Sequence, residues 1–232
     1  MRNIKFDADR QVNIFLVEDH PIFRHGLREL IEQDPSFHVC GEADSVGTAW
    51  SMIEKIQPDL VVVDISLAGR GGLELTRMLK EEYPQLPTLV LSMHEESIYA
   101  ERALQAGARG YIMKHETANL IIDAISQVCA GKVYLSAKMT NELLTKMVGG
   151  TVTAKVEHLD IAQLTNRELE VFELIGIGKT TREISDELCL SPKTIGTYRE
   201  RIKEKMNFRN SAELTHRAVQ WVEVRNSQKD DT

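Results

Sequence analysis

Cysteine is scarce in this chain, with only Cys40, Cys129 and Cys189 among 232 residues. Their odd number, wide separation and lack of CxxC spacing exclude a disulfide framework and a cysteine zinc site, so we expect reduced and mostly buried thiols. Long apolar runs are missing too. No stretch approaches the ~18 apolar residues of a membrane span, and residues 1–7 lack the apolar core of a signal peptide. The sequence therefore predicts a cytoplasmic protein that does not associate with membranes.

What is present is typical of a packed globular protein. Of the residues, 42% are apolar and 27% are charged, and the net charge is −7. This composition excludes extensive disorder, and 232 residues exceed the usual size of one domain, so we expect two. The seven histidines show no metal-ligand spacing, and His20 and His25 fit best as residues on a helix surface.

The most informative residue is Asp64, which ends the apolar run of residues 60–63 and precedes a glycine-rich loop at residues 68–72. An all-apolar run of this length predicts a strand covered on both faces, as in a parallel sheet. Such sheets place their chemistry in the crevice outside the carboxyl ends of the strands. We therefore expect Asp64 to lie at the functional edge of a sheet.

Polar residues also follow three further apolar segments: Glu18 and Asp19 after residues 13–17, Ser92 after residues 88–91, and Lys114 after residues 111–113. If all four segments are parallel strands of one doubly wound sheet, these side chains converge at one edge. Three clustered carboxylates do not all stay ionised without a cation, and Mg²⁺, a hard ion with oxygen ligands, suits such a site. Asp64 could then act as a nucleophile toward phosphorus, with Lys114 and Ser92 on the phosphoryl oxygens.

Each of these residues also has an ordinary structural explanation. An Asp between a strand and a glycine loop is often a turn former. The segment from Glu18 to Pro21 is also typical of a helix start, with Asp19 or His20 near the cap and Pro21 in the first turn. A lone Lys114 is typical of a solvated surface lysine. Their combination at the ends of four strands is what favours a phosphoryl-transfer site.

Four motifs carry a resemblance to a known family: Val17-Glu18-Asp19-His20, Val63-Asp64-Ile65, Leu91-Ser92-Met93 and Gly110-Tyr111-Ile112-Met113-Lys114. In order and spacing they resemble the receiver domain of two-component response regulators, over roughly residues 12 to 130. The resemblance implies a flavodoxin-like, doubly wound, five-stranded parallel sheet. It also implies phosphorylation by a sensor histidine kinase.

The resemblance assigns roles to individual residues as well. Asp64 would be the phosphoacceptor, and Mg²⁺ would be held by Asp19, Asp64 and the main-chain carbonyl of Ser66, with Glu18 completing the acidic pair, directly or through water. Ser92 and Tyr111 would form a switch pair, and Lys114 would contact the phosphoryl group. One departure is Ala68, where many relatives carry a proline that would fix the backbone of this loop.

The middle of the chain contains a predicted helix and a predicted linker. Residues 136–147 predict a helix with Leu143, Leu144 and Met147 on one side, which we expect to pack on a domain or a partner. Residues 149–158 contain two glycines and no amphipathic period, so they predict a flexible linker.

The last part of the chain predicts a helix-turn-helix. Thr165 and Glu168 have the spacing of a capping box at the start of a helix over residues 166–175. A short helix follows over residues 181–187, and then a turn in which Ser191 is an N-cap candidate and Pro192 a first helical residue. The third helix, residues 192–206, is expected to bury Ile195, Tyr198, Ile202 and Met206.

The third helix is also locally basic in an acidic chain. Residues 191–209 contain six basic and two acidic side chains, whereas the whole chain has a net charge of −7. Charge alone would fit a solvated amphipathic helix. Together with the turn geometry, it favours a helix that enters the major groove of DNA.

This half resembles the LuxR-type helix-turn-helix of NarL/FixJ response regulators over residue 164 to about residue 221. The matching residues are Leu164, Thr165, Arg167, Glu168, Val171, Gly178, Glu183, Ile184, Leu188, Ser191, Pro192, Lys193, Thr194, Ile195, Lys205 and Met206. By that resemblance, the residues nearest DNA would be Lys193, Thr194, Thr197, Arg199 and Lys203, and a final helix from residue 211 to about residue 222 could pair subunits. Two residues depart from the resemblance. Relatives often have Lys or Arg where this chain has Gly196, and many have His where it has Tyr198.

The sequence therefore predicts a phosphorylation-controlled, DNA-binding transcription regulator that forms a homodimer when phosphorylated. We expect a receiver at residues 12–132, a linker helix and flexible linker at residues 133–159, and an all-α DNA-binding domain at residues 160–225. It would not be an enzyme. Two alternatives are a constitutive DNA-binding protein whose receiver does not use phosphate, and a Mg²⁺-dependent phosphohydrolase. The phosphohydrolase is disfavoured because Ser66 stands where it would need a second acid.

Overall fold

The computed structural model describes residues 10–67, 71–116, 118–148 and 161–227. The chain divides into two compact units, Met1–Val152 and Thr153–Thr232, which we treat separately. The predicted linker at residues 149–158 and the departure at Ala68 lie outside the described residues. Within the described part, no helix combines the length and the apolar character needed to cross a membrane.

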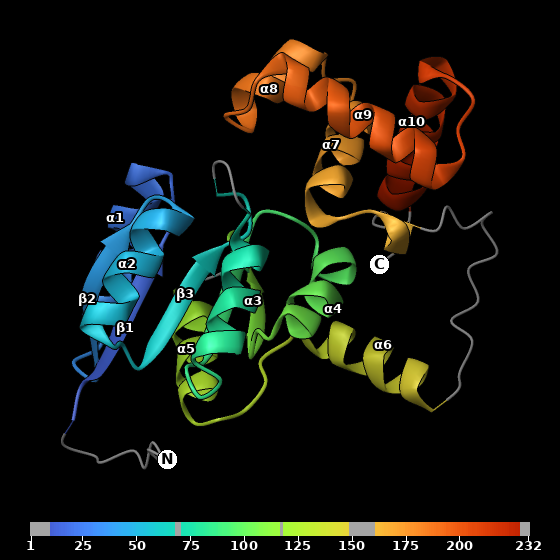
Figure 1. Cartoon of the computed structure of the whole chain (residues 1–232). Helices are drawn as coiled ribbons and strands as arrows, with labels where there is room; N and C mark the ends of the chain where they lie inside the picture. The colour runs from blue at the N-terminus through green and yellow to red at the C-terminus, as the bar shows by residue number, and fades with distance from the viewer. Residues whose placement is uncertain (1–9, 68–70, 117, 149–160, 228–232) are drawn as a thin grey trace. The chain divides into compact units, whose positions relative to one another are not determined.

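In the first unit, strands and helices alternate and then a further helix follows (Figure 1). The elements are β1 (Val12–Val17), α1 (Pro21–Glu32), β2 (Phe37–Ala43), α2 (Val46–Ile56), β3 (Leu60–Asp64), α3 (Gly72–Glu82), β4 (Thr88–Ser92), α4 (Glu96–Ala106), β5 (Gly110–Met113), α5 (Ala118–Cys129) and α6 (Ala137–Met147). All paired strands are parallel, in the order β2-β1-β3-β4-β5. This confirms the predicted doubly wound sheet. The strand β2 was not located by the sequence patterns.

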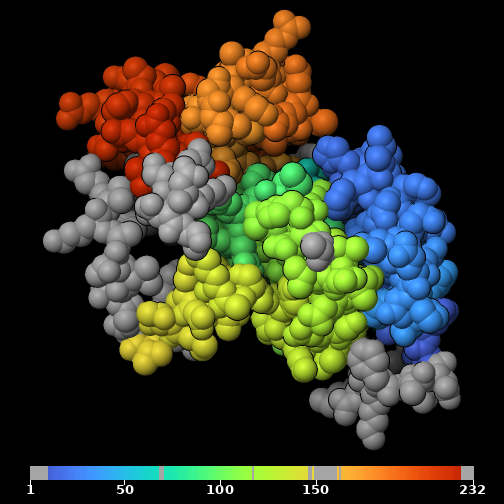
Figure 2. Space-filling view, turned by 180° about the vertical axis from the view of Figure 1, so that it is seen from behind, coloured from blue at the N-terminus to red at the C-terminus, as the bar shows by residue number. Residues whose placement is uncertain are grey.

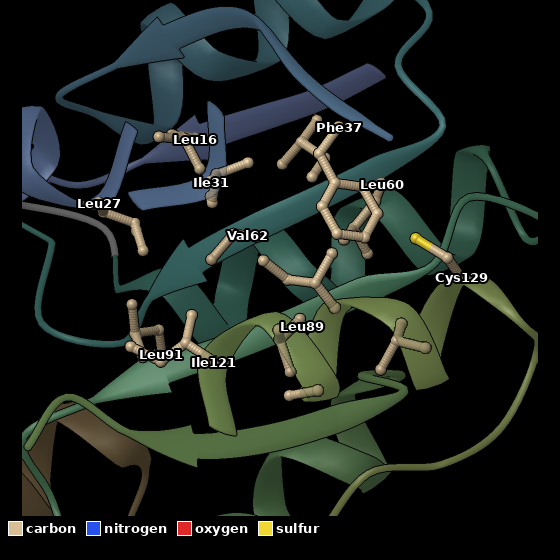
Figure 3. Close-up of a cluster of buried hydrophobic side chains, with 14 of the residues drawn as sticks. Leu16, Leu27, Ile31, Phe37, Leu60, Val62, Leu89, Leu91, Ile121 and Cys129 are labelled. Carbon is tan, nitrogen blue, oxygen red and sulfur yellow. The ribbon is translucent and has the colours of Figure 1, made fainter. Parts of the chain in front are cut away.

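The central strands are buried on both faces, as their apolar sequences predict. Every residue of β3 and β4 is buried. Alternate residues enter two cores: Leu60 and Val62 belong to one cluster, shown in Figure 3, and Val61 and Val63 to the other. The first cluster is completed by residues of α1 and α5, and the second by residues of α2 and α3. Helices on both faces thus leave the ends of the strands as the accessible edge of the sheet.

The strand register brings the polar residues of the four motifs to this edge. Val17 is paired with Val63, Asp64 with Leu91, and Ser92 with Met113. The residues that follow β1 therefore lie next to the end of β3, and Lys114 lies next to the end of β4. Because β1 pairs with both β2 and β3, the connections diverge at this point, which is where ligands bind in such sheets.

The helix α6 packs within this unit mainly through its first turn, and packing of its apolar side on a partner stays a prediction. Its buried residue is Met139, in the first turn, and the helix contacts α4. Leu143 is half-buried, Leu144 is 54% exposed, and the side chain of Met147 is not described. Figure 2 shows α6 in yellow, with its far end standing away from the rest of the first unit. Only the start of the predicted apolar side is therefore covered within this unit.

The second unit consists of a 3-10 turn and four helices in the described residues: η1 (Ile161–Gln163), α7 (Asn166–Gly176), α8 (Thr181–Glu187), α9 (Pro192–Met206) and α10 (Ser211–Ser227). The predicted capping box of Thr165 and Glu168 is present, and Thr180 with Glu183 makes a second one. Gly176 allows α7 and α10 to pack closely, because a Cβ there would lie 2.5 Å from the Ala218 carbonyl oxygen. The all-α prediction for this half is confirmed.

Three details of the second unit differ from the prediction. Ile195 and Ile202 of α9 are fully buried, but Tyr198 and Met206 are only half-buried. Cys189 is exposed, unlike the buried Cys129, since it lies in the turn between α8 and α9. Its backbone has a φ of 51°, a left-handed conformation that this tight turn imposes.

Candidate functional site

Four ionisable residues cluster at the carboxyl edge of the sheet. Glu18, Asp19, His20 and Asp64 each offer one ligand atom, and these atoms lie within 4.8 Å of one another. Glu18 and Asp64 are each only 2% exposed, whereas Asp19 is half-buried and His20 is exposed. The cluster therefore runs from a buried floor to an accessible rim.

Lys114 lies against this floor. Its main-chain N–H donates to the carbonyl oxygen of Ser92 (2.8 Å), which fixes the residue beside the end of β4. Its Nζ lies 2.6 Å from Glu18 Oε2 and 3.0 Å from Asp64 Oδ2, and the side chain is 5% exposed. The ammonium also lies 4.6 Å from the centre of the Phe23 ring. One cation thus faces two buried carboxylates.

The charges at this floor are not balanced. Burial, reinforced by the negative charge of Asp64, raises the pKa of Glu18, and the hydrogen bond and charge of Lys114 only partly offset this. Asp64 Oδ1 is buried and accepts no hydrogen bond from the described residues. A buried carboxylate oxygen without a partner, beside a second acid with a raised pKa, fits a site that binds a further cation. The oxygen donors suit a hard divalent metal ion.

The loop after β4 connects Ser92 and Tyr111 through His94. The His94 N–H donates to Ser92 Oγ (3.0 Å), and the Tyr111 hydroxyl donates to the His94 carbonyl oxygen (2.7 Å). The side chains of Ser92 and Tyr111 are fully buried. His94 Nε2 is also 2.9 Å from Ser66 Oγ, just after β3. A displacement of this loop would therefore alter the hydrogen bonds of three residues near Asp64, namely Ser66, Ser92 and Tyr111.

In the second unit, α9 starts at a well-formed turn. Ser191 Oγ accepts from the Thr194 N–H (3.1 Å), and Pro192 occupies the first turn, as predicted. Farther along, Lys205 Nζ lies 2.6 Å from Glu168 Oε2, which also accepts from the Thr165 N–H (2.7 Å). Burial acts to raise the pKa of Glu168, but the hydrogen bonds from Lys205 and Thr165 outweigh it, so the net shift is downward. Lys205 thus ties α9 to the start of α7.

Comparison with known proteins then decides the family. Residues 14–126 match the family described as response regulator receiver domain, and residues 162–218 match the bacterial regulatory proteins of the luxR family. The chain is 30% identical to the transcriptional regulatory protein DegU of Brevibacillus brevis, over 94% of this chain and 98% of that protein. It is 33% identical to the response regulator GacA of Pseudomonas aeruginosa, over 90% of this chain and 95% of that protein. The chain belongs to the response regulators that carry a LuxR-type output domain.

Solved structures are similar as well. A two-component response regulator of the LuxR family from Aurantimonas sp. is 36% identical and covers 60% of this chain and 99% of its own, with a TM-score of 0.56. RcsB of Salmonella typhimurium is 23% identical over 91% of this chain and 98% of its own, with a TM-score of 0.62, a likeness of fold alone. The chain is a two-component response regulator that acts as a DNA-binding transcription regulator, and not an enzyme.

The structure brings together the receiver residues of this response regulator that the sequence singled out. Glu18, Asp19, Asp64, Ser92 and Lys114 all lie at one edge of the sheet, and the Tyr111 ring is turned into the core. Their roles, and that of the Ser66 carbonyl, stay predictions.

Three residues of this site were not singled out as functional. His20 Nδ1 lies 2.8 Å from Asp19 Oδ1 and 3.2 Å from Glu18 Oε1, although the sequence favoured a plain helix-surface position. His94 joins the loops after β3 and β4, and Arg24 donates to the Glu18 carbonyl oxygen. Its position next to the acidic pair could have indicated His20. Arg24 lies one helical turn after His20, and that spacing could have indicated it. The His94 N–H partner, Ser92, is only two residues away, but no local pattern indicates the partners of its ring and carbonyl, which lie 28 and 17 residues away.

The residues predicted to contact DNA occupy different positions on α9. Lys193 and Thr197 are exposed, and the Thr197 hydroxyl donates to the Lys193 carbonyl oxygen (3.1 Å). The Thr194 hydroxyl lies 2.8 Å from Ser191 Oγ at the helix cap. Arg199 and Lys203 are half-buried, nearer the packed side of the helix. Lys193 and Thr197 are therefore the two exposed residues among these five.

Proposed function

We propose that this response regulator is controlled by phosphorylation of Asp64. The observation that carries the proposal is the asymmetry of this carboxylate: Oδ2 faces Lys114, whereas Oδ1 is buried without a hydrogen-bond partner among the described residues. Oδ1 would attack phosphorus of a phosphohistidine on a sensor kinase. The O–P bond forms as the N–P bond breaks, and the imidazole leaves. Lys114 would then offset the charge of the phosphoryl oxygens.

Mg²⁺ is the cofactor that this site fits best. Asp19, Asp64 and the main-chain carbonyl of Ser66 would hold the ion, with Glu18 as the second acid, directly or through water. This fit rests on the proximity of the carboxylates of Glu18, Asp19 and Asp64, on the Asp64 Oδ1 that lacks a hydrogen-bond partner among the described residues, and on the raised pKa of Glu18. When bound, the ion neutralises charge on the carboxylates and on the incoming phosphoryl group.

Ser92 and Tyr111 would carry the signal out of the site. The Ser92 hydroxyl, which now accepts from the His94 N–H, would turn toward the phosphoryl oxygens. That movement releases the His94 N–H, and the Tyr111 hydroxyl is bonded to the same residue. The loop after β4 would therefore shift with the serine, which alters the surface formed by this loop and α4.

The output of this switch would be promoter binding by a homodimer. Lys193, Thr194, Thr197, Arg199 and Lys203 would lie nearest the DNA, because a helix-turn-helix places this helix in the major groove. Two structures of RcsB, one of two dimers bound to two parallel DNAs and one bound to a promoter in the presence of a phosphomimetic, support such an output. The receiver would span residues 12–132, the linker region 133–159 and the DNA-binding domain 160–225, all in the cytoplasm where the promoter lies.

A second candidate is a constitutive regulator whose receiver does not use phosphate. It is favoured by the Tyr111 ring, because the resemblance to receiver domains implies that this ring turns inward on activation, and in this structure it is already fully buried. Intact-mass spectrometry distinguishes the two after incubation with Mg²⁺ and a small phosphodonor such as phosphoramidate. Phosphorylation control predicts one added phosphoryl group per chain, absent from Asp64→Asn. No mass gain in the wild type, or an equal gain in Asp64→Asn, contradicts the assignment of Asp64.

A further inference from the structure

The outward face of α9 carries an acidic residue within a basic helix. Lys193, Thr197 and Glu200 are spaced four and three residues apart, so they lie on one face on successive turns, and all three are exposed. Ile195 and Ile202, on the other side, are buried. A DNA groove that receives this face therefore meets the Glu200 carboxylate as well as the basic side chain of Lys193.

The Glu200 carboxylate is anchored through one oxygen only. Lys203 Nζ lies 2.8 Å from Oε2, and the Lys203 side chain is 17% exposed whereas that of Glu200 is 66% exposed. The lysine is thus the covered partner and the glutamate the outward one. Within the described residues, Oε1 has no hydrogen-bond partner. The ion pair engages Oε2 and leaves Oε1 to accept from a donor outside the chain.

Gly196 lies one turn before Glu200, at the i,i+4 spacing of neighbours on a helix surface. A Cβ at Gly196 would meet no atom within 4 Å, and the backbone φ is not left-handed. Neither packing nor backbone conformation therefore requires a glycine, although glycine weakens a helix interior relative to alanine. The missing side chain leaves the backbone of α9 bare beside Glu200. A bare backbone permits close approach to another surface.

We propose that Gly196 and Glu200 form a base-reading pair, in which Glu200 Oε1 accepts a hydrogen bond from the exocyclic N4 amine of a cytosine in the major groove. The proposal rests on the DNA-binding function of this domain. Phosphates repel a carboxylate, so its partner has to be an N–H donor on a base edge. Adenine offers such a donor, but next to the N7 acceptor, which suits an amide side chain better than a carboxylate. Gly196 would let the helix enter deeply enough for Glu200 to reach the base.

Selection from a library of randomised DNA duplexes tests this reading. Full-length protein with Mg²⁺ and beryllofluoride is used to retain duplexes, which are then sequenced. We expect the wild-type motif to contain a cytosine that Glu200→Ala no longer selects, with a loss of roughly tenfold in preference at that position. Glu200→Gln should move the preference there to adenine, since Gln pairs with adenine N6 and N7. The control Glu204→Gln, one turn farther along, should leave the motif unchanged.

The outcomes separate the proposal from the function beneath it. Identical motifs for wild type and Glu200→Ala overturn base reading by Glu200 while DNA binding stands. A wild-type protein that selects no motif overturns both. Gly196→Ala gives an independent check, because we expect a higher Tm together with weaker binding of the selected duplex. Unchanged or tighter binding by Gly196→Ala would contradict the close approach of α9.

Discussion

Replacing Lys114 by methionine leaves the buried carboxylates of Glu18 and Asp64 facing each other without the ammonium between them. The Nζ distances of 2.6 and 3.0 Å give an attraction of about 6 kcal/mol for each pair at an effective dielectric constant of about 20. Desolvation of three nearly buried charges cancels much of this. Because removal of one partner of a buried ion pair typically costs about 3–5 kcal/mol, we expect a loss of about 3 kcal/mol in the free energy of unfolding at pH 7.5.

The loss should depend on pH in a definite direction. The pKa of Glu18 is already raised by burial and by Asp64, and Lys114 acts to lower it, so Lys114→Met raises it further. A group with a raised pKa in the folded state stabilises the fold below its unfolded value, near 4.5, and loses that contribution as the pH rises through the folded pKa. The difference between variant and wild type should therefore shrink as the pH is lowered from 7.5 toward 5. Added Mg²⁺ should shrink it as well, because the ion supplies the missing positive charge.

Urea unfolding at pH 7.5 and pH 5, with and without Mg²⁺, measures all three effects. Lys138→Met is a matched control, since Lys138 is an exposed lysine for which no change in stability is expected. Equal unfolding free energies for Lys114→Met and wild type at pH 7.5 would refute the proposed balance of charge. A loss that stays constant between pH 7.5 and pH 5 would refute the role given to Glu18.

Three further predictions concern the neighbourhood of the site and the second domain. Gly72→Ala places a Cβ 1.8 Å from the Asp64 carbonyl oxygen, so α3 has to shift. We expect the free energy of unfolding, measured in urea, to fall by about 3 kcal/mol, and the rate of phosphorylation to fall as well. Glu168→Gln weakens the link to Lys205, so we expect the variant to have a lower Tm than the wild type at neutral pH. Because the pKa of Glu168 is lowered in the fold, the stability that its carboxylate adds is present above pH 4.5 and is lost as the pH falls below that value. The difference in Tm between variant and wild type should therefore vanish in acid. Mg²⁺ affinity measured by calorimetry should fall as the pH drops toward the raised pKa of Glu18, and a pH-independent affinity would contradict metal binding beside Glu18.

Local sequence patterns were sufficient to predict the strands and helices that position the site. The apolar run before Asp64 predicted a doubly covered strand, and β3 is buried throughout. The capping residues Thr165 and Ser191 marked the starts of α7 and α9, because capping depends on residues three apart in the chain. By contrast, β2 has a mixed burial pattern that gives no clear periodicity.

What the sequence could not supply are contacts between distant residues. The link from Lys205 to Glu168 spans 37 positions, so a basic residue counted with the DNA-facing charge is in fact tied to α7. His94 meets Ser66 and Tyr111 across strands that only the folded sheet brings together. Such contacts depend on register and packing, which no local pattern specifies.

The central claim is that a phosphoryl group on Asp64 controls DNA binding by the second domain. It is tested most directly by retention of fragmented host genomic DNA on wild type and Asp64→Asn, each with Mg²⁺ and with or without beryllofluoride as a substitute for the phosphoryl group. We expect beryllofluoride to change which fragments the wild type retains, and to have no effect on Asp64→Asn. The same fragments held by the wild type in both conditions would contradict phosphate control.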